Sequence, residues 1–229
     1  NKTSEAVELS IYSYFEWCLG SSADHHREFH KTFIETHFDA QLNAMLATKR
    51  LWEIPLGDRG HWNVEYPYFG YISSNQPILD YEGDKEKFIG QYGDLANPQS
   101  VNQEKLSNTL GKWNDSIGTV RVKLPVAAKE TKDAAFYMGI DGDKEALESE
   151  KKSIEVAKKC IEESKRNYQE PEEIADALQE VKRFWEDNRQ ALEVVTPDDS
   201  VNLLANVWLR YQAVAGRLWG RTAYYQQSG

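Results

Sequence analysis

The sequence has few cysteines, and the two that it has stand far apart. Cys18 and Cys160 are the only cysteines among 229 residues. Their number and spacing exclude a disulfide framework and the closely spaced pairs of a zinc site. Two unpaired thiols are typical of a reducing compartment, so we expect a cytoplasmic location.

Positive charge is also scarce, and long apolar runs are missing. The chain has 27 Lys and Arg residues against 37 Asp and Glu residues, with a formal net charge of -10. The positive residues form no basic stripe of the kind that nucleic acid or anionic lipid requires. No apolar run approaches the length of a membrane span. We therefore expect neither nucleic acid nor a membrane as a partner.

Aromatic residues, in contrast, are plentiful, with 7 Trp and 12 Tyr. Aromatic rings often stack on the C–H faces of sugars, but in most proteins they are ordinary core residues. The aromatic content is therefore a hint of carbohydrate binding that needs support from other features.

The first 140 residues predict an antiparallel β-sandwich. Apolar and polar residues alternate from Val7 to Leu19, which indicates a long half-buried strand. Further strands are expected over 29–38, 41–50 and 61–73, with turns about every ten residues. Two more alternating segments, 119–126 and 134–140, predict an antiparallel pair joined by a hairpin at Ala127–Thr131.

The hydrophobic period changes from two to about 3.6 after Gly142. Leu147, Ile154, Ile161 and Tyr168 stand seven residues apart among charges, which predicts a helix with a narrow apolar seam. Pro171 begins a second predicted helix. We interpret residues 141–195 as a helical linker.

The last segment, 196–229, predicts a buried helix. Thr196 is a suitable N-cap, Pro197 fits the first turn, and Asp198 and Asp199 favour the positive end of the helix dipole. The apolar positions that follow at helical spacing are Val201, Leu204, Val207, Trp208, Tyr211, Ala215, Leu218 and Trp219. Such a helix needs packing partners on most of its circumference. We therefore expect the chain to be a fragment of a larger protein.

The same segment carries a family resemblance. Its residues are Leu204, Asn206, Trp208, Leu209, Tyr211 and Gln212, then Arg217, Trp219, Gly220 and Arg221, then Tyr225, Gln226, Ser228 and Gly229. They resemble the opening of the (α/α)6 barrel in glycoside hydrolase family ninety-four, which comprises cellobiose, cellodextrin and chitobiose phosphorylases and domains of cyclic glucan synthases. The Phe-Ile-Gly-x-Tyr-Gly run within Asp84–Asn97 is similar to a segment of their amino-terminal domain.

The resemblance implies an α+β fragment in three parts. Residues 1–140 would be the carboxy-terminal portion of a larger β-sandwich, 141–195 the helical linker, and 196–229 the first helix of the barrel. It also implies an inverting β-glycoside phosphorylase that acts on a β-linked oligosaccharide and works as a homodimer. Inorganic phosphate would be the co-substrate, with no metal or organic cofactor.

The resemblance also implies roles for two arginines. Arg221 matches an arginine that contacts the donor sugar, where a guanidinium fork can hold hydroxyl oxygens. The alternative is a helix-end arginine that neutralises the last carbonyl groups. Arg27 lies where the family has an arginine that touches the acceptor sugar, although it could equally be a surface residue. The family's catalytic acid would lie beyond Gly229, so we expect the chain alone to be inactive.

Other kinds of site are less well supported by the sequence. His25, His26, His30, Glu35 and His37 invite a metal site, but His30 and His37 would point to opposite faces of a strand. Cys18 has no histidine partner nearby in the sequence, so a nucleophile is not expected. The main alternative function is a non-catalytic module, in which the β-sandwich binds carbohydrate or forms a dimer contact.

Overall fold

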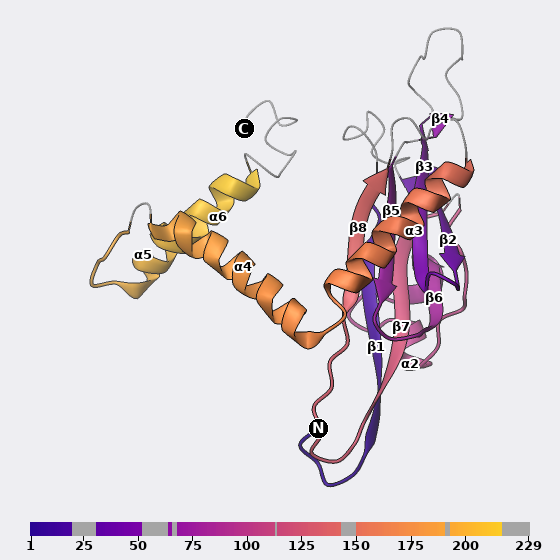
Figure 1. Cartoon of the computed structure of the whole chain (residues 1–229), viewed down its shortest axis with the longest axis horizontal. Coiled ribbons are helices and arrows are strands. Elements are labelled where there is room, and N and C mark those ends of the chain that lie inside the picture. The colour runs from indigo at the N-terminus through magenta and orange to yellow at the C-terminus, as the bar shows by residue number, and fades with distance from the viewer. Residues whose placement is uncertain are drawn as a thin grey trace. The chain divides into compact units, whose positions relative to one another are not determined.

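The computed structural model describes residues 1–19, 31–51, 64–65, 68–112, 114–142, 150–190 and 193–216. The chain divides into two compact units, Asn1–Gln169 and Glu170–Gly229. All of the described strands belong to the first unit, which we call the sandwich unit. The described part of the second unit is helical, and we call it the helical unit (Figure 1).

The sandwich unit contains two antiparallel sheets. In the first sheet β7 (Ser116–Val126) lies between β1 (Val7–Glu16) and β6 (Ile78–Asp84). In the second sheet the order is β2 (Ile34–Asp39), β3 (Ala44–Leu51), β5 (Tyr68–Ser74) and β8 (Phe136–Gly142), and the short β4 (Val64–Glu65) pairs with β3. The 3-10 turn η2 (Lys31–Phe33) precedes β2.

The main core of the sandwich unit forms where residues of both sheets pack together. Trp17, Ile34, Met45, Ile72 and Val120 form one buried cluster, to which Phe15 and Phe38 are added. A Cβ atom at Gly70 would lie 2.7 Å from the ring of Trp17, so glycine is what allows this ring to approach the sheet. The alternation from residue 7 to 19 thus predicted a half-buried strand correctly, but β1 ends at Glu16, and Leu9, placed on the apolar side, is 47% exposed.

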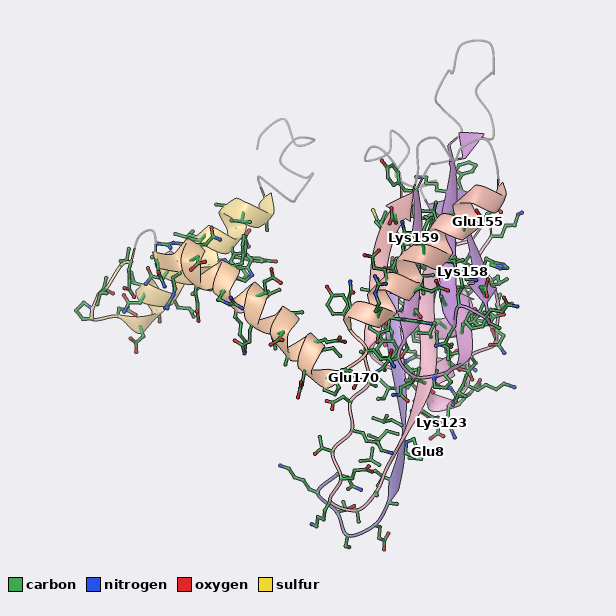
Figure 2. The ribbon with its side chains drawn as sticks, viewed as in Figure 1. Glu8, Lys123, Glu155, Lys158, Lys159 and Glu170 are labelled. Atoms are coloured by element: carbon green, nitrogen blue, oxygen red, sulfur yellow. The ribbon has the colours of Figure 1, made fainter. Side chains whose placement is uncertain are left out.

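Helices cover other faces of the two sheets. Ala157 and Ile161 of α3 (Glu150–Asn167) are buried against a cluster of residues from the second sheet. Glu155, Lys158 and Lys159 are exposed on the same helix (Figure 2). The first sheet contributes Ile117 to a third cluster with Phe88 of α1 (Lys85–Ile89), and Val101 of α2 (Gln99–Asn102) packs against it.

The described part of the helical unit contains α4 (Pro171–Gln190), α5 (Asp199–Leu203), a π-helical turn η5 (Leu204–Trp208) and α6 (Leu209–Val214). None of its described side chains is buried. Leu203, Trp208 and Leu209 are 63%, 54% and 56% exposed.

The fold class predicted from the sequence is confirmed, because two antiparallel sheets are followed by helices. One pairing was wrong. Segments 119–126 and 134–140 do become β7 and β8, but β7 pairs with β1 and β6, whereas β8 pairs with β5. A turn does form after β7, where the Glu130 N–H donates to the Ala127 carbonyl at 3.2 Å.

The chain then crosses to the other sheet, and Asn75 holds it there. Asn75 exchanges two hydrogen bonds with the backbone of Ala135, of 2.9 and 3.2 Å. Alternation indicates that a segment is a strand but does not identify its neighbour, so the hairpin could not be excluded from the pattern. Strand β6 was not expected, because Leu79 is exposed while Asp80 and Glu82 are buried, which inverts the usual pattern.

Candidate functional site

The two arginines predicted to contact sugar lie outside the described residues. Arg27 falls in the gap 20–30, and Arg221 falls after residue 216. Their roles remain predictions. What the structure describes is the helix that leads toward Arg221, together with α4 in the same unit.

The start of this helix differs from the prediction at one residue. Asp198, rather than Thr196, is the N-cap, and its carboxylate accepts a hydrogen bond of 2.8 Å from the Ser200 N–H. The Thr196 hydroxyl accepts from the Asp198 N–H at 3.2 Å, so it supports the cap residue. Pro197 therefore precedes the cap and does not occupy the first turn. A carboxylate at this position also favours the helix dipole.

Two asparagines hold the extended segment before the helix. Asn202 accepts from the Thr196 N–H at 2.7 Å and donates to its carbonyl at 3.0 Å. Asn206 makes the same pair of bonds with Val194, at 2.8 and 2.7 Å. The two asparagines lie four residues apart on a helix, and the two backbone groups that they contact lie two residues apart on an extended segment. These two separations are similar in length, so both asparagines reach their partners. The two amides thus fix the path of residues 194–196.

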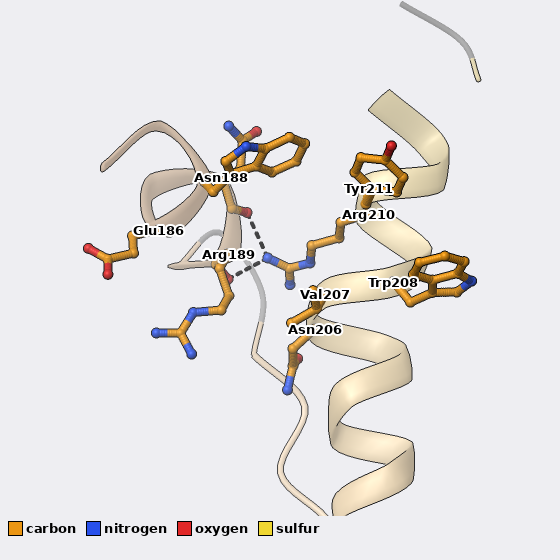
Figure 3. Close-up of a pocket in the computed structure, with 9 residues that line it drawn as sticks. Glu186, Asn188, Arg189, Asn206, Val207, Trp208, Arg210 and Tyr211 are labelled. Carbon is orange, nitrogen blue, oxygen red and sulfur yellow. Dashed lines mark hydrogen bonds between the residues drawn. The ribbon is translucent and has the colours of Figure 1, made fainter. Parts of the chain in front are cut away.

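Arg210 joins α6 to the end of α4. Its Nη1 donates to the carbonyl of Asn188 at 2.6 Å and also to the carbonyl of Arg189 (Figure 3). The last carbonyl groups of a helix have no partner within the helix, and they carry its negative dipole end. A guanidinium therefore satisfies both their hydrogen-bonding and their electrostatic requirements.

These contacts border a pocket of about 450 Å³. Its aromatic walls are Trp185, Trp208 and Tyr211, and the centroid of the Tyr211 ring lies 5.9 Å from both tryptophan rings. The π-helical turn contains Asn206, Val207 and Trp208, so this irregularity supplies one side of the pocket (Figure 3). Such walls can hold an apolar or ring-shaped group. Glu186 is the only carboxylate among the lining residues described, so they offer no carboxylate pair for acid–base catalysis.

A buried pair of charged side chains, which the sequence did not reveal, lies on the first sheet. Arg121 faces Asp80 across β6 and β7, and its Nε donates to the Asp80 carboxylate at 2.8 Å. Both residues are buried, and the hydrogen bond with Asp80 raises the pKa of Arg121. Only the alternation of Asp80 and Glu82 along β6 could have signalled such a group. The sequence alone could not reveal that Arg121 lies opposite.

Glu82 is fully buried beside this pair. Its carboxylate accepts from the Asp84 N–H at 3.1 Å and from the Ser107 N–H at 3.3 Å, and the Ser107 hydroxyl also donates to it. Burial raises the pKa of Glu82, and these hydrogen bonds oppose the increase. A raised pKa suits a general acid, but a carboxyl with no exposed surface cannot reach a substrate. We therefore assign Glu82 a structural role.

The cysteines and histidines give no catalytic or metal site among the described residues. The Cys160 thiol donates to the Asp141 carboxylate, and burial followed by this contact raises its pKa to about 12. A thiol with so high a pKa is a poor nucleophile at neutral pH. No group of His, Cys, Asp or Glu within the described ranges could hold a metal ion. His25, His26 and His30 lie outside those ranges, and His37 is exposed.

Comparison with known protein families gives two matches in chain order. Residues 1–163 match the model of the glycosyl hydrolase 94 supersandwich domain, and residues 184–229 match that of the glycosyl hydrolase 94 catalytic domain. The chain belongs to glycosyl hydrolase family 94. The family resemblance inferred from residues 204–229 is therefore confirmed. The second match includes α6 and the segment that contains Arg221.

Three proteins show what this family 94 chain is similar to in sequence. It is 26% identical over the whole of this chain to the cyclic beta-(1,2)-glucan synthase NdvB of Rhizobium meliloti. It is 25% identical to the N,N'-diacetylchitobiose phosphorylase of Vibrio proteolyticus over 72% of this chain. It is 24% identical to the solabiose phosphorylase of Paenibacillus borealis over 96% of this chain. The matches span 7%, 19% and 26% of the lengths of these relatives, respectively.

No helix in the described part of the chain has the length and apolar character needed to cross a bilayer.

Proposed function

We propose that this chain supplies the sandwich, the linker and the first barrel helix of an inverting β-glycoside phosphorylase. The observation that carries the proposal is the pair of family matches in chain order, with the supersandwich domain before the catalytic domain. Two of the relatives described above are named as phosphorylases. The free thiols Cys18 and Cys160 support a cytoplasmic location.

The reaction exchanges one bond at the anomeric carbon for another. A carboxylic acid gives its proton to the glycosidic oxygen, and the bond between that oxygen and the anomeric carbon breaks. A phosphate oxygen attacks the same carbon from the opposite face, so that a β-linkage becomes an α-sugar 1-phosphate. The proton ends on the released saccharide. Phosphate thus replaces the water of an inverting hydrolase, and no metal or organic cofactor is needed.

The chain's own part in this reaction is to bind and orient. Arg221 would hold hydroxyl groups of the donor sugar, because its planar fork fixes two donors in one direction. Arg27 would contact the acceptor sugar in a homodimer. The catalytic acid would belong to a part of the catalytic domain beyond Gly229, so the chain alone would be inactive.

The test measures phosphorolysis directly. A protein of the relatives' length that contains this chain is incubated with phosphate and β-linked disaccharides, and ³¹P NMR monitors sugar phosphate. We expect an α-sugar 1-phosphate from the long protein and none from the chain alone. Release of sugar phosphate by the chain alone would contradict the assignment of the acid. Synthesis of a glucan without any phosphate-dependent cleavage would contradict the proposed reaction.

Variants of the long protein test the role of Arg221. Arg221→Lys keeps the charge but loses the fork, so we expect kcat/KM to fall at least about tenfold, the factor that corresponds to about 1.4 kcal/mol. Arg183→Ala, an exposed position on α4, is the control and should leave kcat/KM unchanged. Equal activity of Arg221→Lys and the unmodified protein would show that Arg221 does not bind the donor sugar through two bonds.

A further inference from the structure

A cavity of about 710 Å³ lies in the sandwich unit, and its lining includes Asp84 and Ser107, the two residues that hydrogen-bond to the buried Glu82. Residues of α1, α2 and the segment 103–108 line it, and we call it the α1–α2 cavity. Its size lies in the range of about 300–1,000 Å³ that is usual for small-molecule sites. It belongs to the face of the first sheet that carries Phe88 and Leu106.

The frame of the α1–α2 cavity is held by internal hydrogen bonds. The Asp84 carboxylate accepts from the Glu86 N–H at 3.0 Å and so caps α1. The Ser100 hydroxyl donates to the Lys87 carbonyl at 3.2 Å, which ties α2 to α1. The Asn108 side chain accepts from the Tyr81 N–H at 3.1 Å. These bonds hold the backbone of the walls in place.

Three glutamine side chains in the lining take no part in the hydrogen bonds that hold the helices together. The side-chain amides of Gln91, Gln99 and Gln103 make no hydrogen bond to any residue that the structure describes. Each amide offers two donors and one acceptor. A sugar hydroxyl also both donates and accepts, so this lining complements a ligand that is rich in hydroxyl groups.

The charges in the α1–α2 cavity are balanced. Lys87 and Lys105 are matched by Asp84 and Glu86. A site for phosphate or for a polyanion would carry an excess of positive charge. The balance favours a neutral ligand.

Gly90 sets the position of one of the glutamines. Its φ of 89° lies in the left-handed region, and a Cβ atom there would stand 2.7 Å from the Cβ of Gln99. Glycine therefore allows the Gln99 side chain to lie close against the end of α1.

An exposed aromatic residue lies in the loop that continues from the lining, although it is not itself one of the lining residues. Tyr92 follows Gln91 directly, is 97% exposed and has a φ of 61°. Its loop is held at both sides, because the Gly93 N–H donates to the Gly90 carbonyl at 3.1 Å and Asp94 accepts from the Ala96 N–H at 2.8 Å. A backbone conformation of this kind in a non-glycine residue often marks a functional position. A fully exposed ring on a fixed loop is suited to stack on the C–H face of a sugar.

We propose that the α1–α2 cavity binds a neutral oligosaccharide at a site separate from the one that contains Arg221. Tyr92 stacks on one sugar ring, and Gln91, Gln99 and Gln103 bond to its hydroxyl groups. The site is non-catalytic, and it holds a glycan on the sandwich unit. It does not depend on the proposed phosphorolysis.

The experiment is an NMR titration of the ¹⁵N-labelled full chain with two neutral probes, cellotetraose and a β-1,2-linked glucotetraose. We expect the side-chain amide signals of the three glutamines and the backbone signals of Gly90 and Gly93 to shift with at least one probe. Tyr92→Ala should weaken this binding about tenfold, and Gln103→Ala should weaken it severalfold. Gln41→Ala, an exposed glutamine in the turn between β2 and β3, is the control and should bind as the unmodified chain does.

Arg221→Ala separates this proposal from the proposed function. Binding at the α1–α2 cavity should survive Arg221→Ala, whereas phosphorolysis by the long protein should not. Three results would overturn the inference: no shift with either probe, shifts confined to other residues, or unchanged affinity in both Tyr92→Ala and Gln103→Ala. Loss of binding in Arg221→Ala alone would also overturn it, because the glycan would then occupy the site that contains Arg221.

Discussion

The sandwich unit and the helical unit present their apolar residues in opposite ways. In the sandwich unit Ile34, Met45, Ile72 and Val120 have no exposed surface. In the helical unit no described side chain is buried. Both units have sequences with clear apolar periodicity. The difference shows that periodicity determines the type of element, whereas burial depends on the neighbours that the element finds.

Polar contacts join the described elements of the helical unit at three points. Asn202 and Asn206 hold residues 194–196, and Arg210 holds the end of α4. Each hydrogen bond of this kind contributes only about 0.5–1.5 kcal/mol. Such contacts fix the geometry of the chain but provide little of the free energy that burial provides in the sandwich unit. The two units should therefore respond differently to the same kind of change.

The largest effect is expected at the buried ion pair of the sandwich unit. Arg121→Ala leaves the Asp80 carboxylate buried without its partner, which costs about 3–5 kcal/mol of unfolding free energy. Urea unfolding followed by tryptophan fluorescence measures this loss. Replacing both residues by leucine should restore most of it, because no uncompensated charge remains. A loss of unfolding free energy below about 1 kcal/mol in Arg121→Ala would contradict the description of this contact as a buried ion pair.

The next largest effect compares apolar residues on two helices directly. Ile161 of α3 is buried, and Ile161→Ala should cost about 2–5 kcal/mol. Leu178 of α4 is 53% exposed, and Leu178→Ala should cost less than about 0.5 kcal/mol. Both values come from urea unfolding of the full chain. Similar losses in the two variants would show that α4 is packed as firmly as α3.

A smaller and local effect is expected at Asn206. Asn206→Ala removes both hydrogen bonds to the backbone of Val194, for a loss of about 1–3 kcal/mol that is confined to the helical unit. Hydrogen exchange at the Val194 amide should become faster, while exchange in β7 stays the same. Asn167→Ala, at the exposed end of α3, is the matched control. Unchanged exchange at Val194 would show that Asn206 does not hold this segment in place.

The smallest effect is a change in pH dependence at Glu82. Burial places the pKa of Glu82 in the folded state above its value in the unfolded state. The folded protein therefore retains a proton that the unfolded chain releases, so this residue's contribution to stability falls as pH rises through the folded-state pKa. Glu82→Gln should remove that fall. Parallel curves of stability against pH for the unmodified chain and Glu82→Gln would contradict the raised pKa of Glu82.

The sequence predicted much of the fold, since the alternation in β1, β7 and β8 and the helical period in α3 and α4 each indicated the correct type of element. Strand pairing was not predictable, because the same alternation fits a hairpin and a crossover between sheets. The cap of α5 was missed by two residues, since Thr196 and Asp198 are both good N-caps.

The candidate sites were less accessible to sequence reasoning. The pairing of Asp80 with Arg121 joins residues far apart in the chain, and only the sheet register brings them together. The α1–α2 cavity likewise depends on the packing of two short helices. The resemblance correctly identified the family, and it pointed to Arg27 and Arg221, whose roles stay predictions.

Hydrogen exchange of the full chain, followed by mass spectrometry, tests the contrast between the two units most directly. We predict that peptides from β1 and β7 exchange slowly, at rates set by unfolding of the sandwich unit. Peptides from α4, α5 and α6 should exchange orders of magnitude faster, because none of the side chains described in these helices is buried. Equal protection of α4 to α6 and of β7 would contradict the account, since the helical unit would then be as stable as the sandwich unit.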